Sequence, residues 1–330
     1  METAREYIES QVQSNGMQIG MLNIMSANAV VEKVKQTPIP NDLYNGLWHE
    51  GEVACLFADS NLGKSILAVQ IAEEISRDRR VLYVDCELSD KQFQMRYYSE
   101  ERDVTHKFPD SLYRATIAPG GTVSGSYEDA IISHIEKAAN TLDAKIIIVD
   151  NLTYLCNTSE KGDAAGIFMM KLMTLKMKYG WSLLIIAHTP KRDTRAAITP
   201  NDLAGSKKLF NFFDTIFAIG KCRYDENFRY ILQVKVRVGE FLYPEDNVVV
   251  CEISKDEDGF LKFAHRGFGS ESDQLKDADN TELITNICML RSQGLKVRDI
   301  ATTLGISKSK VGRLSQRCEA SSCQASAMDE

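Results

Sequence analysis

Residues 53–72, VACLFADSNLGKSILAVQIA, contain an apolar run, a short polar loop and a second apolar run. The first run, residues 53–57, has the length and composition of a buried β-strand, and the second has apolar residues at helical spacing. The loop between them ends in Gly63-Lys64-Ser65. A strand, a glycine-containing loop and a helix in this order are typical of a loop that binds the phosphates of a nucleotide. The segment therefore predicts an α/β fold built around a phosphate-binding loop.

The residue types in this loop suit a nucleoside triphosphate with Mg²⁺. Backbone N–H groups of the loop and the helix start form a concave donor surface, which the helix dipole reinforces. Gly63 lets the backbone approach phosphate oxygens, Lys64 brings a positive charge to the β- and γ-phosphates, and Ser65 suits a Mg²⁺ ligand. The predicted ATP-binding residues are Ala58, Asp59, Ser60, Asn61, Leu62, Gly63, Lys64 and Ser65.

One position departs from the usual pattern G-x-x-x-x-G-K-[ST]. Ala58 stands where that pattern begins with glycine. Alanine is the smallest residue that has a Cβ, and asparagine, here Asn61, tolerates a positive φ better than most residues. We therefore expect the loop to close around phosphates.

The composition is that of a globular chain. It has 330 residues, 44% of them hydrophobic and 26% charged, which is enough for about two domains. The first ten residues, METAREYIES, lack a long apolar run, so we expect no signal peptide, no membrane span and a cytoplasmic location. The eight cysteines form no C-x-x-C pair, and we expect small buried residues rather than zinc ligands.

Apolar runs alternate with segments of helical periodicity along most of the chain. The expected strands are residues 53–57, 81–84, 146–149, 183–187 and 216–219, and the expected helices are 65–76, 89–98, 127–142 and 164–179. This alternation predicts a mostly parallel sheet flanked by helices. Runs at 230–238, 248–253 and 261–264 follow one another after short turns, which predicts antiparallel strands at the sheet edge.

The same patterns divide the chain. Residues 267–280 combine glycine, serine and acidic residues without apolar periodicity, which is typical of a linker. We therefore predict an N-terminal helical segment at 1–38, an α/β domain at 39–266, the linker at 267–280, an all-α domain at 281–317 and a frayed tail at 318–330. Within the N-terminal segment the expected helices are residues 2–12 and 27–34.

Two carboxylates follow predicted buried strands, where a phosphate-binding loop needs them. Asp150 ends the apolar run at 146–149 and is expected to hold Mg²⁺ together with Ser65. Glu87 follows the strand at 81–84 and is predicted to orient or deprotonate the attacking water, with Asp85 as the alternative. These residues together predict ATP hydrolysis.

Residues 39–264 resemble the RecA-like ATPase core, most of all the RepA and DnaB branch of hexameric helicases. Four segments carry the resemblance: 40–51, 81–96 with Glu87, 183–188 ending in His188, and 235–239, KVRVG. The resemblance implies a homo-oligomeric ring, a hexamer, in which His188 senses the γ-phosphate. It also implies that Lys235 and Arg237 reach the γ-phosphate bound by a neighbouring subunit, because a planar, permanently charged guanidinium suits transition-state oxygens.

In such a ring, the loops at 152–166 and 189–205 would face a central channel. The second loop carries Lys191, Arg192 and Arg195, which we expect to contact the phosphates of single-stranded DNA irrespective of sequence.

The C-terminal segment is basic although the whole chain carries a net charge of −7. Residues 282–317 hold seven basic and two acidic residues, a net charge of +5. Residues 297–311 resemble the helix-turn-helix of resolvase-type and sigma-like DNA binders, with Gly305 at the turn and Ser307 as the N-cap of the third helix. The resemblance implies duplex contacts from Lys308, Lys310 and Arg313 over a core of Ile300, Leu304, Ile306, Val311 and Leu314. A three-helix interaction domain is the alternative.

Two functions remain open on the sequence. The favoured one is an ATP-driven ring motor on DNA, a RepA-like replicative helicase of a plasmid or mobile element. The alternative is an ATP-switched DNA-binding regulator or recombination accessory protein without unwinding activity. A small-molecule kinase is disfavoured because it would need neither the segment at 235–239 nor the basic C-terminal helices.

Overall fold

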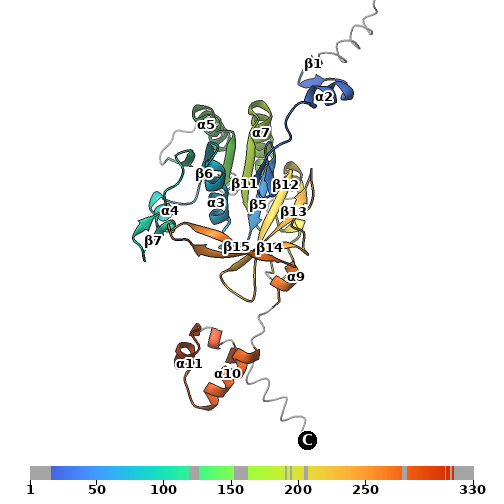
Figure 1. Cartoon of the computed structure of the whole chain (residues 1–330). Helices are drawn as coiled ribbons and strands as arrows, with labels where there is room; N and C mark the ends of the chain where they lie inside the picture. The colour runs from blue at the N-terminus through green and yellow to red at the C-terminus, as the bar shows by residue number, and fades with distance from the viewer. Residues whose placement is uncertain are drawn as a thin grey trace, which may run out of the picture.

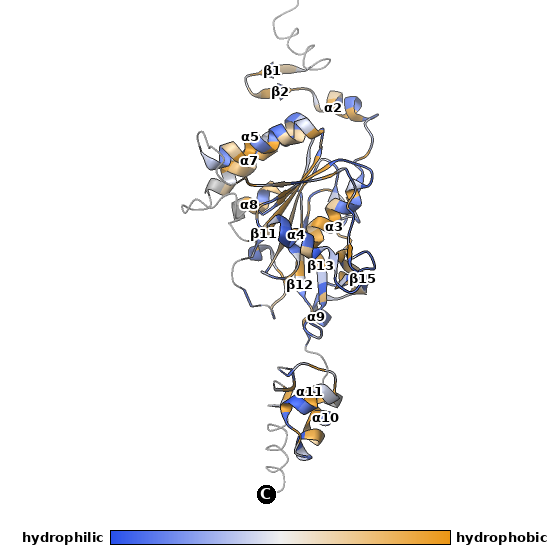
Figure 2. Ribbon diagram, turned by 90° about the vertical axis from the view of Figure 1, so that its left-hand side faces the viewer, coloured by the Kyte–Doolittle hydropathy of each residue, from blue (hydrophilic) through white to orange (hydrophobic). Residues whose placement is uncertain are grey.

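The computed structural model describes residues 16–118, 126–151, 163–189, 192–193, 195–203, 207–276, 281–308, 310–312 and 314–315. A nine-stranded sheet runs through these residues in the order β15-β14-β13-β12-β5-β11-β10-β6-β9 (Figure 1). Helices cover both of its faces (Figure 2). The predicted α/β class is confirmed.

Six neighbouring strands of the sheet are parallel. They are β5 (Val53–Ala58), β6 (Val81–Asp85), β9 (Leu112–Thr116), β10 (Ile146–Asp150), β11 (Ser182–His188) and β12 (Thr215–Lys221). All but β9 contain a predicted apolar run, because a strand covered on both faces is apolar at nearly every position. The sequence analysis missed β9, an edge strand of sequence LYRAT in which no residue is fully buried.

The antiparallel edge is also confirmed. It consists of β13 (Phe228–Val236), β14 (Val248–Lys255) and β15 (Leu261–Gly269), each paired antiparallel with its neighbour. These strands extend the parallel sheet beyond β12. Strand β12 in turn lies beside β5, the strand that leads into the phosphate-binding loop.

Each face of the sheet has its own apolar core. On one face α3 (Lys64–Ser76) and α4 (Asp90–Arg96) cover the sheet, and Leu67 and Ile71 of α3 have no exposed surface. On the other face lie α5 (Tyr127–Leu142), α7 (Asp163–Tyr179) and α8 (Lys207–Phe212), with Phe168 and Trp181 fully buried. Complete burial of a side chain such as Leu67 contributes about 2 kcal/mol, so the two clusters fix the sheet that carries the site.

Short elements surround the sheet. They are the hairpins β1 (Met17–Ile19) with β2 (Leu22–Ile24), β3 (Asp42–Tyr44) with β4 (Trp48–His49) and β7 (Tyr98–Ser99) with β8 (Val104–Thr105), and α2 (Ala27–Val34). The helix predicted at 27–34 is α2, whereas the one predicted at 2–12 lies outside the described residues. The β1-β2 hairpin corrects the prediction of a purely helical N-terminal segment; its strands of three residues are too short to give a periodic signal.

The linker predicted at 267–280 begins too early. Strand β15 continues to Gly269, and a short helix, α9 (Glu271–Gln274), follows it. The carboxylate of Glu271, 2% exposed, accepts hydrogen bonds from the Ile198 N–H and the Tyr230 hydroxyl, each at 2.8 Å. Polar contacts rather than apolar periodicity hold residues 267–274 against the α/β domain, which explains why the sequence pattern missed them.

Replacing Glu271 with alanine should lower the free energy of unfolding of the α/β domain by about 2 kcal/mol, because it leaves the buried Tyr230 hydroxyl and the partly buried Ile198 N–H without an acceptor. Thermal unfolding of the full chain measures the loss. Glu240→Ala, at an exposed position, should leave the transition within about 0.5 kcal/mol of wild type. Equal stability of the two variants would contradict the structural role of Glu271.

The described C-terminal residues form helices α10 (Thr281–Ser292) and α11 (Val297–Thr303), followed by helical residues 308, 310–312 and 314–315. The apolar side chains expected to form their core do pack together: Ile300, Val311 and Leu314 are buried, and Leu304 and Ile306 are partly buried. Gly305 has φ 64°, and the Ser307 hydroxyl accepts a hydrogen bond from the Lys310 N–H at 3.2 Å, as an N-cap does.

Three of the cysteines, Cys55, Cys222 and Cys251, are free and buried, as expected. Cys86 is free and half-buried. Cys288 is disulfide-bonded, which the sequence analysis did not anticipate. No helix in the described part of the chain has the length and apolar composition needed to span a bilayer.

Candidate nucleotide-binding site

Four parallel strands bring the predicted ATP-site residues together at the carboxyl ends of the strands. In the register of the sheet, Asp150 of β10 pairs with Asp85 of β6, and His188 of β11 pairs with Ala58 of β5. Each strand therefore ends where the phosphate-binding loop begins. A cavity of about 470 Å³ opens there, lined by Ser60, Asn61, Gly63, Lys64, Ser65, Ile66, Glu87, Arg96, Asp150 and His188.

The loop has the backbone shape expected of a phosphate cradle. Asn61 has φ 63° and Gly63 has φ 97°, so the loop uses the left-handed region twice, as anticipated for Asn61. The Lys64 ammonium group donates hydrogen bonds to the carbonyl oxygens of Ala58 and Asp59, both at 2.9 Å. Burial lowers the pKa of Lys64, while Asp150, Glu87 and Asp59 favour its charged form. The ammonium group is thus held at the loop by carbonyls that phosphate oxygens can replace.

Gly63 is needed both for its backbone angle and for space. A Cβ at this position would lie 2.9 Å from the Phe263 ring, whereas a Cβ at Gly180, φ 67°, would meet nothing within 4 Å. Gly180→Ala should therefore destabilise the protein by about 1 to 2 kcal/mol through its backbone angle alone, and Gly63→Ala should cost more, because its new Cβ also meets the Phe263 ring. ATP titration and thermal unfolding compare the two variants. Equal losses of stability and unchanged ATP affinity in both would contradict this role.

Asp150 is a candidate ligand for Mg²⁺. Its side chain is 2% exposed, accepts a hydrogen bond from the Tyr83 hydroxyl at 2.6 Å, and is hydrogen-bonded to Ser65. Burial raises the pKa of Asp150 to about 6, while the Ser65 and Tyr83 hydrogen bonds act in the opposite direction. One carboxylate and one hydroxyl beside bound phosphates are the donors that Mg²⁺ typically takes from a protein. The residues present therefore fit the ion, which would neutralise charge on the phosphates.

The two carboxylates after β6 have different surroundings. Asp85, 2% exposed, accepts the N–H groups of Glu87 and Leu88 at 3.0 Å each and forms an ion pair with Arg114 at 2.9 Å. One of its carboxylate oxygens holds the turn that presents Glu87, and the other binds Arg114. Glu87 itself is 42% exposed and lines the cavity. Of the two, Glu87 is therefore the one whose carboxylate is open to water in the cavity.

A polar cluster connects Glu87 with the end of β11. The Asn151 side-chain amide donates to the Glu87 carboxylate and lies 3.0 Å from His188 Nε2. His188 Nε2 is 3.5 Å from Glu87. Burial, and then the nearby Lys64 charge, lower the pKa of His188, while Glu87 acts in the opposite direction; the net effect favours the neutral imidazole, whose Nε2 can accept from Asn151. Thr189, the next residue, donates to Asp59 of the phosphate-binding loop.

Sequence reasoning missed two residues of this site. Asn151 follows Asp150 directly, and its position after a buried strand was the available signal. Arg96 ends α4 and lines the cavity, and its Nη1 atom is buried without a hydrogen-bond partner among the described residues. A buried, unpaired guanidinium nitrogen beside a polyanion site marks Arg96 as a further candidate for contact with the nucleotide.

The structure does not bring Lys235 and Arg237 to this cavity. The Lys235 ammonium group donates to the Phe210 carbonyl at 2.9 Å, and Arg237 pairs with Asp214 at 2.7 Å and donates to the Asn211 carbonyl. Both residues lie at the end of the sheet opposite the phosphate-binding loop. Val236, between them in sequence, pairs with Thr215, and Thr215 pairs with Ala54 near the start of β5, whereas the loop follows the end of β5.

The candidate DNA contacts are described in part. Arg192 forms an ion pair with Asp202 at 3.6 Å and is only 10% exposed, whereas Arg195 is exposed. Lys308 is exposed and Lys310 is half-buried. Lys191 and Arg313 lie outside the described residues. Arg192 is therefore a poorer candidate for a phosphate contact than the sequence predicted.

Comparison with known proteins assigns the family. A family model described as an AAA domain matches residues 23–194, more than half of the chain, including the phosphate-binding loop, Asp150 and His188. A KaiC-like protein from the archaeon Pyrococcus horikoshii has a similar structure, with a TM-score of 0.48 and 14% sequence identity, covering 67% of this chain and 94% of that one. No curated protein matches the sequence. The chain belongs to the AAA domain family and is a P-loop ATPase.

Proposed function

We propose that this ATPase is a ring-forming motor that moves along single-stranded DNA, a RepA-like replicative helicase of a plasmid or mobile element. The proposal rests on the position of Lys235 and Arg237, which lie at the opposite end of the strands from the phosphate-binding loop of the same chain. From this position the two cations cannot reach the triphosphate bound by their own subunit, so any triphosphate that they contact is bound by a neighbouring subunit.

The sheet register supports this argument. Residue 54 of β5 is in line with Thr215 and Val236, whereas Ala58, which precedes the loop, is in line with Ile219 and Ile231. At about 3.3 Å per residue, these two levels are roughly 13 Å apart. A head-to-tail contact places the surface that carries Lys235 and Arg237 of one subunit against the phosphate-binding loop of the next subunit. Repetition of this contact closes a ring. A hexamer is the ring size we propose.

Within each site the residues have separate tasks. Lys64 and the loop amides hold the β- and γ-phosphates, and Glu87 orients the attacking water. Asn151 donates to the Glu87 carboxylate and to Nε2 of His188, so departure of the γ-phosphate changes the surroundings of a cluster that continues into Thr189. The segment after Thr189 includes exposed Arg195, and we propose that it passes this change to DNA in the channel.

The C-terminal helices supply the second proposed contact with DNA. Exposed Lys308 follows the Ser307 N-cap, and the third helix packs over Ile300 through Val311. A basic helix held in this way suits the major groove of a duplex. We propose that Lys308, Lys310 and Arg313 make these contacts.

Strand displacement on a forked duplex tests the motor. The wild-type chain should unwind the fork with ATP and Mg²⁺, and Lys64→Ala should abolish unwinding because it removes the charge that holds the γ-phosphate. Lys107→Ala, which removes an exposed lysine outside the site, should unwind at the wild-type rate. ATP hydrolysis by the wild type without any unwinding would instead indicate the ATP-switched regulator.

A further inference from the structure

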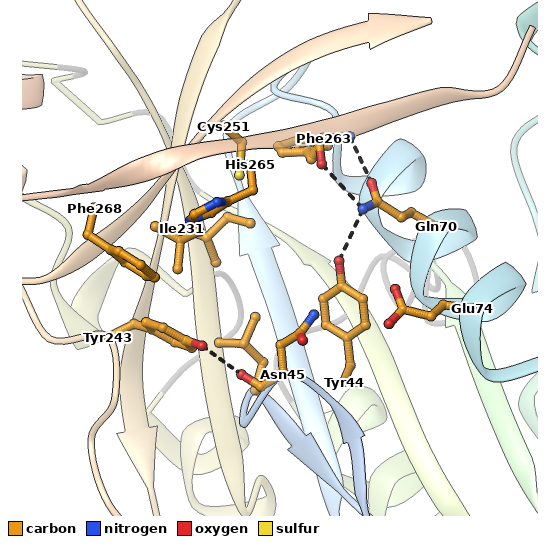
Figure 3. Close-up of a pocket in the computed structure, with 12 residues that line it drawn as sticks. Tyr44, Asn45, Gln70, Glu74, Ile231, Tyr243, Cys251, Phe263, His265 and Phe268 are labelled. Atoms are coloured by element: carbon orange, nitrogen blue, oxygen red, sulfur yellow. Dashed lines mark hydrogen bonds between the residues drawn. The ribbon is translucent and has the colours of Figure 1, made fainter. Parts of the chain in front are cut away.

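A second cavity lies on the α3 face of the sheet and shares no lining residue with the nucleotide site. Its volume is about 290 Å³, and Figure 3 shows its walls. They come from the β3-β4 hairpin, from α3, from the antiparallel strands β13, β14 and β15, and from Tyr243 in the segment between β13 and β14. The lining residues are Tyr44, Asn45, Leu47, Gln70, Glu74, Ile231, Tyr243, Val249, Cys251, Phe263, His265 and Phe268.

Aromatic rings dominate these walls, and internal contacts hold them in place. Tyr243 stacks on Phe268 with ring centroids 6.2 Å apart and planes 7° apart, and its hydroxyl donates to the Asn45 carbonyl at 3.0 Å. Gln70 accepts from the Phe263 N–H at 2.7 Å and donates to the Tyr44 hydroxyl at 3.3 Å. The cavity is therefore preformed, and a ligand would pay little to order its walls.

The charge around the cavity is negative. Glu74 of α3 lines it, and Figure 3 shows its carboxylate beside the ring of Tyr44. The nearest arginine along the helix, Arg77, pairs with Glu73 at 3.1 Å. None of the described residues that line the cavity is lysine or arginine. Partial burial raises the pKa of Glu74, the Arg77 charge acts in the opposite direction, and the charges of Glu73 and Asp42 add to the increase.

Aromatic faces and a carboxylate together favour an organic cation. The face of an aromatic ring attracts a positive charge, and an ionised carboxylate adds a charge-assisted hydrogen bond to an ammonium group. The volume corresponds to about ten non-hydrogen atoms, taking roughly 30 Å³ for each water-sized atom. We propose that this cavity is a binding site for a small aromatic ammonium ion, with its ring among Tyr44, Tyr243 and Phe263 and its charge at Glu74.

The site is close to the ATPase machinery without being part of it. The ring of Phe263, which lines the cavity, also lies against Gly63 of the phosphate-binding loop. Gln70, which hydrogen-bonds to Phe263, is on α3, the helix that begins at Lys64. An occupant would therefore touch a side chain that packs on the phosphate-binding loop.

Three probes of the same ring and similar size test the proposal by calorimetry or ligand-observed NMR on the full chain. They are tyramine, which carries an ammonium group, tyrosol, in which a hydroxyl replaces it, and 3-(4-hydroxyphenyl)propionate, an anion. Tyramine should bind about fivefold more tightly than tyrosol, and the anion most weakly, because of the ion pair and the ring faces. Equal affinity of the three probes, or binding of none, would overturn the proposal.

Two variants locate the binding. Glu74→Gln at an exposed position should leave the fold intact and remove the preference for tyramine over tyrosol, whereas Asp78→Asn, which removes an equal charge four residues further along, should keep it. Val249→Phe should fill the cavity and abolish binding of both probes, with ATP binding as the check that the chain is folded. Unchanged tyramine affinity in both Glu74→Gln and Val249→Phe would show that the probe binds elsewhere.

Discussion

Arg237→Ala should lower kcat for ATP hydrolysis by about a thousandfold, the scale of losing an arginine from a phosphoryl-transfer site. In the free chain this guanidinium is bound to Asp214 at 2.7 Å and is 46% exposed, so it is available at the surface for a neighbour's γ-phosphate. Arg237→Lys should recover only part of the rate, since a point charge does not cover two oxygens as a planar fork does. Steady-state hydrolysis at concentrations where gel filtration shows the assembled protein measures both.

A matched control separates catalysis from folding. Arg266 forms a similar pair with Glu252 at 2.7 Å and is 49% exposed, but it lies on β15 and is not one of the cations proposed to act on the neighbour's nucleotide. Arg266→Ala should hydrolyse ATP at the wild-type rate. An Arg237→Ala variant within threefold of wild type would rule out the trans-acting role.

Glu87→Gln should lower the rate of hydrolysis by about 10² to 10⁴ while ATP affinity stays within a few fold of wild type. The reason is that the amide keeps the size of the side chain but cannot orient or accept a proton from the attacking water as the carboxylate does. Single-turnover hydrolysis and ATP titration separate the two effects. Asp85→Asn should behave differently and mainly lower the melting temperature, because Asp85 holds the turn and Arg114. Hydrolysis by Glu87→Gln at the wild-type rate would reject Glu87 as the base.

The sequence predicts those parts of the fold that are buried on both faces. Strands such as β5 and β10 are apolar at nearly every position, and their ends locate Asp150 and the loop without any tertiary information. It fails for β9, where half-burial mixes arginine and threonine with leucine, and for α9, where Glu271 is held by polar contacts with residues far away in the chain.

For the site, the sequence identifies residues that a local motif fixes, and it misses those that only the fold brings in. Lys64 and Ser65 follow from the loop, and Glu87 from its place after β6. Arg96 comes from the end of α4, and only the packing of that helix places it beside the loop. Asn151, just after β10, contacts Glu87 after β6 and His188 at the end of β11, the two strands that flank β10, so these contacts depend on sheet order.

In the proposed ring, one subunit's Glu87 and its neighbour's Arg237 complete the same ATP site. Mixing the inactive Glu87→Gln and Arg237→Ala proteins tests this directly, because a subunit with intact Glu87 then meets a neighbour with intact Arg237. In an equal mixture about a quarter of the head-to-tail contacts are of this kind, so hydrolysis should return to a substantial fraction of the wild-type rate. A mixture no more active than its two components would contradict the claim.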